Sequence, residues 1–157
     1  MTRKGIVVTI AVAFILLSAI PAEVFAQDLD PLVGTWNLRS SLTQAPFIGV
    51  QTFNMGGTTV EYDTAGTNPA SSPGESIVLG NWKKAADGSY DIKEQNYIYD
   101  SSGNLKYVAI TVFKISIDPT KNHFGGGGVT HFNFCSVDQC PGPLFASTPL
   151  QLTGTRF

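Results

Sequence analysis

The stretch Leu32-Val33-Gly34-Thr35-Trp36-Asn37-Leu38-Arg39 decides the fold that we predict for this chain of 157 residues. Its alternation places the large apolar side chains Leu32, Trp36 and Leu38 on one face of an extended strand. Near the other end of the sequence, Gly154-Thr155-Arg156-Phe157 repeats the Gly-x spacing, with an arginine in place of the tryptophan. First and last strands are neighbours in a closed antiparallel barrel. We therefore expect the guanidinium of Arg156 to cover the indole of Trp36, a cation–π contact that closes one end.

A Gly-x-Trp motif on the first strand with an arginine on the last strand resembles the lipocalins and the wider calycin group. The residues from Leu32 to Trp36 also resemble the opening of bacterial lipocalin-like domains. The resemblance implies an up-and-down barrel in which Gly34, Trp36 and Arg156 close one end, and a role in binding small molecules. The alternative is another all-β fold, in which Trp36 and Arg156 are ordinary core and edge residues.

The rest of the sequence predicts an all-β protein, a closed antiparallel up-and-down barrel of about eight strands, because turns or polar loops separate short alternating segments. The glycine run Gly125 to Gly128 predicts a bulge or a tight barrel corner rather than a phosphate-binding loop, since no helix follows it. We assign Pro141 to Pro149 to the rim. The expected strands are 32–39, 49–54, 58–63, 76–83, 90–100, 105–117, 129–135 and 150–157.

The N-terminal residues predict export from the cytoplasm. Arg3-Lys4 precedes an apolar run from Ile6 to Ile20, and Val24-Phe25-Ala26 has small residues where a signal peptidase requires them. An apolar run of about fifteen residues is short for a membrane span of roughly 20, so a retained anchor is the weaker alternative. We expect a signal peptide over 1–26, removed near Ala26, and a secreted or periplasmic lipocalin-like barrel domain over 27–157.

Charge and cysteine content exclude several partners. The net charge is −2 and there is no basic run, which argues against nucleic acid and against an anionic membrane surface. Cys135 and Cys140 are the only cysteines, and in an oxidising compartment we expect them to form a disulfide. A metal site that combines them with His131 is disfavoured, because neither His123 nor His131 has metal-ligand spacing to a partner. We expect no metal and no cofactor.

The expected interior is aromatic and aliphatic, with a few hydroxyl groups. This composition is typical of a site for a small hydrophobic or amphipathic molecule, and also of a filled barrel core. We favour an exported, non-catalytic binding protein of lipocalin-like type. The expected ligand-binding residues are Tyr62, Trp82, Tyr107, Thr111, Phe113 and Phe132.

Glu94 separates this hypothesis from an enzymatic one. A cyclase, isomerase or dirigent-like enzyme on a barrel of the allene oxide cyclase type requires a carboxylate such as Glu94 inside the cavity. The alternation of this strand permits two orientations. We expect Tyr97 and Tyr99 to point inward and Glu94 to be solvated, which argues against the enzyme.

The expected outward faces bear on membranes and on self-association. An outer-membrane barrel needs an unbroken apolar outer face, whereas Lys106 and Lys114 point outward on the longest strand, so we expect no stable membrane insertion of the mature chain. The same strand carries an outward apolar band of Val108, Ile110 and Val112. A second subunit could cover this band in a homo-oligomer.

Overall fold

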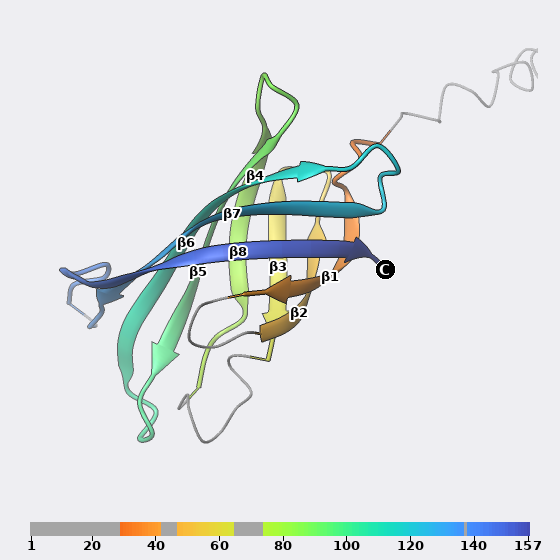
Figure 1. Cartoon of the computed structure of the whole chain (residues 1–157). Coiled ribbons are helices and arrows are strands. Elements are labelled where there is room, and N and C mark those ends of the chain that lie inside the picture. The colour runs from red at the N-terminus through yellow and green to blue at the C-terminus, as the bar shows by residue number, and fades with distance from the viewer. Residues whose placement is uncertain (1–28, 42–46, 65–73, 137) are drawn as a thin grey trace, which may run out of the picture.

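The computed structural model describes residues 29–41, 47–64, 74–136 and 138–157. They form a closed barrel of eight antiparallel strands in sequence order (Figure 1). The all-β closed barrel is thus confirmed, whereas the expected signal peptide lies outside the described residues. The described part of the chain contains no helix long and apolar enough to cross a membrane. The strands are β1 (Gly34–Ser40), β2 (Phe47–Phe53), β3 (Thr58–Asp63), β4 (Val78–Lys84), β5 (Tyr90–Tyr99), β6 (Leu105–Ile117), β7 (His123–Phe134) and β8 (Leu144–Arg156).

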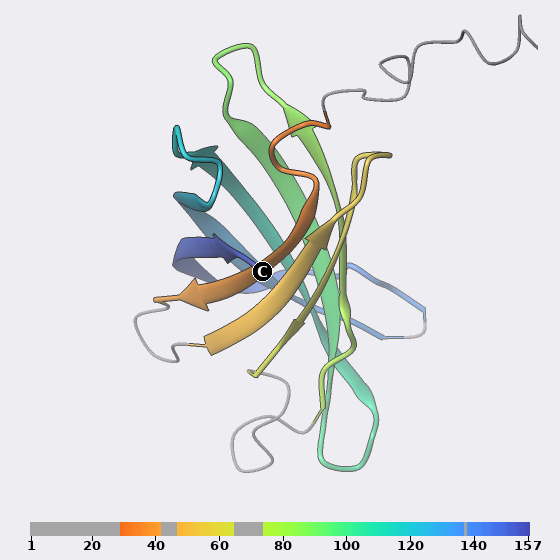
Figure 2. The ribbon, with the colours of Figure 1, turned by 90° about the vertical axis from the view of Figure 1, so that its right-hand side faces the viewer.

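The two ends of the described chain close the barrel. Strand β8 pairs with β1 in a register that sets Trp36 opposite Arg156 and Ser40 opposite Leu152. The C-terminus therefore lies beside β1, as both views of the ribbon show (Figures 1 and 2). This arrangement confirms that the first and last strands are neighbours, and closure leaves no open sheet edge in this part of the barrel.

The strands differ in length around the barrel. Strands β6 and β8 have 13 residues each, whereas β1 has 7 and β3 has 6. The long strands consequently extend beyond the short ones at one end of the molecule (Figure 1). Among the described strands, the residues of β8 from Leu144 to Leu150 pair with β7 only, and Pro149 lies in this segment. Proline is tolerated there because it need not donate a hydrogen bond toward β1.

The glycine run does not form the corner that we expected. Gly125 to Gly128 lie within β7 and pair residue by residue with β6. A Cβ atom on Gly128 would lie 2.5 Å from the Cα atom of Phe113, so glycine lets β7 approach β6 unusually closely. The assignment of Pro141 to Pro149 to the rim is also wrong from Leu144 onward, where β8 begins. Glycine and proline have low strand propensity, which concealed both segments.

A hydrophobic cluster fills one end of the barrel. Phe124 packs on Trp36 with ring centroids 5.0 Å apart and on Phe53 at 6.3 Å. This cluster, which we call the floor, excludes water from the closed end and supports the residues above it. The floor consists of Leu32, Trp36, Leu38, Phe53, Tyr90, Ile92, Phe113, Ile115, Phe124, Leu150 and Leu152.

The side chains of strand β3 face the opposite way to our prediction, which placed its apolar residues inside the barrel. Tyr62 is 63% exposed and Val60 is 40% exposed, so both lie on the outer wall. Thr59 and Glu61 point inward and are only 1% and 5% exposed. Tyr62 is therefore not an interior residue. The pattern misled because the inner wall beside β3 is polar, with Gln51 directly opposite Glu61 in the sheet.

Candidate functional site

The closed end of the barrel is sealed by Arg156. Its guanidinium carbon lies 4.4 Å from the centroid of the Trp36 ring. The same guanidinium donates hydrogen bonds to the carbonyl oxygens of Val33 at 3.2 Å, of Lys121 at 3.0 Å and of Pro31. Gly34 makes this possible, since a Cβ atom there would lie 2.8 Å from Arg156 Nη1. The side chain thus fastens the chain before β1 to the end of β8.

The segment before β1 is held from several sides. The Trp36 indole donates its N–H to the carbonyl of Leu32 at 2.9 Å. Asp30 accepts hydrogen bonds from the Tyr90 hydroxyl at 2.6 Å and from Lys84 Nζ at 3.0 Å. Burial raises the pKa of Asp30, but these hydrogen bonds outweigh it and hold that pKa below its ordinary value. These contacts fix the segment before β1 across the closed end of the barrel.

Above the floor lies a group of buried polar side chains, which we call the polar layer: Gln51, Thr59, Glu61 and Glu94. Their exposed fractions are 0%, 1%, 5% and 3% in that order. They come from three strands, β2, β3 and β5, and Gln51 Nε2 donates a hydrogen bond to Glu94 Oε1. The expectation that Glu94 is solvated is therefore wrong. Burying two carboxyl groups is costly, so the polar layer is an unusual core and a candidate site.

Gly80 gives Glu94 its place inside the barrel. The two residues are paired across β4 and β5. A Cβ atom on Gly80 would lie 2.5 Å from the carbonyl oxygen of Lys93 and would overlap the Glu94 side chain. The glycine of the second Gly-x-Trp motif, Gly80-Asn81-Trp82, thus leaves room for the buried side chain of Glu94. Gly34 leaves room for the side chain of Arg156 in the same way.

Three buried polar atoms in the polar layer have no hydrogen-bond partner among the described residues. These atoms are Gln51 Oε1, Thr59 Oγ1 and Glu61 Oε1, and all three are shielded from solvent. A buried acceptor without a partner costs free energy on the order of 1–3 kcal/mol. The interior consequently presents hydrogen-bonding capacity that the described protein does not satisfy.

Both carboxyl groups hold their protons more tightly than exposed ones. Burial raises the pKa of Glu94 to about 7, although contacts with Thr59, Glu61 and Gln51 partly oppose the shift. Burial also raises the pKa of Glu61 well above its ordinary range, and repulsion from Glu94 and Asp63 adds to this. Near neutral pH the pair therefore carries less negative charge than two exposed glutamates would. A carboxyl group with a pKa near 7 can also give or take a proton.

The inner wall opens toward the end opposite the floor. Thr111 lies directly across from Glu94 in the sheet and bonds to Thr130 through their hydroxyls at 3.0 Å. Asn96 donates a hydrogen bond to Glu75 at 2.9 Å. Along the inner face of β6, Phe113 and Ala109 are buried, whereas Thr111 and Tyr107 are half-buried. We call the end of the barrel opposite the floor, toward which Tyr107 lies, the open end.

The expected ligand-binding residues separate into three groups. Phe113 and Trp82 belong to or pack against the floor, where Trp82 contacts Phe53 and Tyr90. Thr111, Phe132 and Tyr107 are on the inner wall toward the open end. Tyr62 is outside. Whether the five inner residues bind a ligand stays a prediction.

Sequence reasoning missed the polar layer apart from Glu94. Gln51 shares a buried strand face with Phe53. Placing Tyr62 inside puts Glu61, the residue before it, on the outer face, and that placement is wrong. The usable signal was Gly80, whose missing side chain faces both Thr59 and Glu94 in the register.

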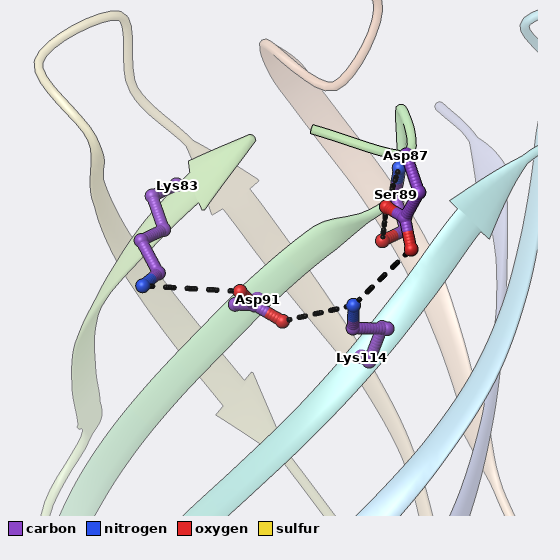
Figure 3. Close-up of polar contacts among 5 residues, drawn as sticks. All are labelled: Lys83, Asp87, Ser89, Asp91 and Lys114. Atoms are coloured by element: carbon purple, nitrogen blue, oxygen red, sulfur yellow. Dashed lines mark hydrogen bonds and ion pairs between the residues drawn. The ribbon is translucent and has the colours of Figure 1, made fainter. Parts of the chain in front are cut away.

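A shallow groove of about 650 Å³ crosses the outer face of β4 to β7. Asp91 lies between Lys83 and Lys114, at 3.9 Å and 3.5 Å, and Asp87 also contacts Lys114 at 3.4 Å (Figure 3). Hydrogen bonds from Ser89 lower the pKa of Asp87 to about 2, so that residue stays ionised. These exposed pairs largely cancel their charges, and such pairs contribute little stability.

The expected subunit-binding band on β6 is smaller than predicted. Val108 is only 2% exposed in the single chain, whereas Val112 is 44% exposed and Ile110 is half-buried. Val108 pairs with Tyr97 and Asn133 on either side. Asn133 in turn binds the carbonyl of Gly142, in the loop that carries the disulfide between Cys135 and Cys140. One group of exposed apolar side chains lies on or beside β2 to β4: Ile48, Val50, Val60, Tyr62, Ile77 and Leu79.

The described residues contain no cluster of three or more His, Cys, Asp or Glu side chains that could hold a metal ion. No family model, curated protein or solved structure matches the chain. The fold therefore defines its class: a closed, eight-stranded, up-and-down antiparallel barrel, consistent with a calycin-like fold. Within this barrel, the polar layer above the floor is the candidate site.

Proposed function

We propose that the barrel binds one small amphipathic molecule, as an exported lipocalin-like protein would. The polar layer carries this proposal, because it places unsatisfied acceptor atoms of Gln51 and Glu61 above an aromatic floor. Small-molecule sites combine apolar walls with a few polar groups that fix orientation. A ligand entering at the open end would bring its polar group to the polar layer and leave its apolar body along the inner wall.

Fluorescence titration with the neutral aromatic probe N-phenyl-1-naphthylamine tests this function. We expect saturable binding of one probe per chain, with quenching of tryptophan emission. Substituting Thr111→Phe should weaken binding at least tenfold, because the added ring occupies the inner wall. The matched control is Val112→Phe, one residue along on the outer face, which should bind like the original protein. Equal binding by both variants would place the probe elsewhere and overturn the proposal.

A second candidate function is proton transfer on the bound molecule, as in a cyclase or isomerase. Glu94 favours it, because a buried carboxyl group with a pKa near 7 suits a general acid or base. Glu94 as carboxylate would take a proton from carbon next to a ligand carbonyl, and the protonated Glu94 would return a proton to the resulting enolate. We expect faster deuterium exchange into phenylacetone in heavy water with the original protein than with Glu94→Gln. Equal rates would remove this candidate.

We also propose that the protein works outside the cytoplasm after removal of a signal peptide. The Cys135–Cys140 disulfide is compatible with an oxidising compartment. N-terminal sequencing of the exported protein should begin at Gln27. A chain that retains Arg3 and Lys4 in the cell envelope would instead indicate an uncleaved anchor.

A further inference from the structure

The chemistry of the polar layer identifies the kind of polar group that the ligand presents. The amide nitrogen of Gln51 already donates to Glu94, while the amide oxygen of Gln51 and one carboxyl oxygen of Glu61 have no partner. These two atoms are acceptors, and the third unsatisfied atom of the polar layer, the Thr59 hydroxyl oxygen, can accept as well as donate. A ligand that satisfies the two acceptors must donate hydrogen bonds.

No cationic side chain of the described residues faces the polar layer. Arg156 lies at the closed end, and its nitrogens are engaged by three carbonyl groups. The other described basic residues are all exposed on the outside or in turns: Arg39, Lys83, Lys84, Lys93, Lys106, Lys114 and Lys121. An anionic group brought to this depth would thus meet two carboxyl groups and no counter-charge.

We propose that the barrel selects an amphipathic amine over a carboxylic acid of equal chain length, with the ligand nitrogen at Gln51, Glu61 and Glu94. A protonated amine supplies three donors, and its positive charge stabilises the ionised form of the two buried carboxyl groups, which otherwise hold their protons. A carboxylate offers only acceptors, and its burial beside like charges is unfavourable. This inference rests on the proposed function, since it names the ligand class for the same interior site.

The test compares three ligands of one chain length, octylamine, octanol and octanoate, by displacement of N-phenyl-1-naphthylamine at neutral pH. We expect octylamine to bind at least tenfold more tightly than octanoate, with octanol between them. In the double variant Glu61→Gln/Glu94→Gln the preference should fall to threefold or less, while octanol affinity changes less than threefold. The matched control is Asp87→Asn/Asp91→Asn, which removes the same charge from the outer face and should keep the full preference.

The outcomes separate the two proposals. Octanoate binding as tightly as octylamine, with Thr111→Phe still blocking both, would overturn the amine preference and leave interior binding intact. Binding of none of the three ligands and no probe binding would overturn the proposed function itself. Circular dichroism of each variant shows that its strands are intact. Should the double variant fail to fold, the ratio of octylamine to octanoate affinity in the original protein decides the inference alone.

Discussion

At the scale of single residues, the two Gly-x-Trp motifs share one purpose. Gly34 lies beneath the guanidinium of Arg156, and Gly80 lies beneath the carboxyl-bearing side chain of Glu94. In both cases a Cβ atom at the glycine would collide with the neighbouring ionisable side chain, at Arg156 Nη1 for Gly34 and at Glu94 Cγ for Gly80. Each motif thus combines a large aromatic residue with a gap, and the gap lets a charged side chain enter a barrel that is otherwise closely packed.

Substituting Gly80→Ala should therefore destabilise the barrel by about 1–3 kcal/mol, because the added methyl group collides with the Glu94 side chain and with the Lys93 carbonyl. Urea denaturation measures the change. Gly125→Ala is the matched control, since Gly125 also lies in a strand and a Cβ atom there would meet nothing within 4 Å. Equal stability of the two variants would show that Glu94 can move away from β4.

At the scale of elements, strand β3 shows where sequence reasoning succeeded and where it could not. The strand and its hairpin with β2 follow from alternation and from the Gly56-Gly57 turn, and both are present. Which of its side chains point inward does not follow from the sequence, because Glu61 is buried inside the barrel and Tyr62 is exposed outside it. Local patterns describe one strand, whereas the partners of Glu61 come from β2 and β5. Breaks of this kind concentrate at functional sites.

The pairing of β1 with β8 depends on Arg156. Substituting Arg156→Ala removes the contact with the Trp36 ring and leaves the carbonyls of Pro31, Val33 and Lys121 without this donor. We expect a loss of roughly 2–4 kcal/mol of stability, measured by urea denaturation. Arg39→Ala, an exposed arginine on the outer side of β1, should change stability by less than about 0.5 kcal/mol. A similar small effect at Arg156 would refute its role in closure.

The disulfide belongs to one loop rather than to the whole barrel. Cys135 and Cys140 are separated by 5 positions, and the loop is also held by the bond from Asn133 to Gly142. Chain-entropy arguments give so short a loop at most about 2 kcal/mol of stabilisation. We expect the variant Cys135→Ser/Cys140→Ser to keep the strand signal in circular dichroism with a modest fall in urea midpoint. Loss of the strand signal would instead make the disulfide essential to folding.

At the scale of the whole molecule, the buried carboxyl pair ties stability to pH. The folded-state pKa values of Glu94, about 7, and of Glu61 lie above the ordinary value of 4.5. Between these limits the folded state holds protons that the unfolded state releases, so stability is full below about pH 4.5 and falls as pH rises through 7. Four acids have lowered pKa values and affect the pH dependence of stability only at lower pH: Asp30, Asp87, Asp100 and Asp118.

We therefore expect the urea midpoint to be lower at pH 8 than at pH 5. Glu94→Gln removes one titrating group and should flatten the dependence, whereas Asp91→Asn on the outer face should leave it as it is. A midpoint that rises from pH 5 to pH 8 would show that the pair is ionised without cost in the folded barrel.

The contact between Trp36 and Arg156 also sets the order in which this protein can mature. It joins residues near opposite ends of the described chain, so every strand must be made before the wall can close. Until β8 docks, β1 and β7 each present an unpaired edge that can recruit strands from other chains. A chain cut short before β8 should therefore aggregate, because its barrel wall stays open between β7 and β1.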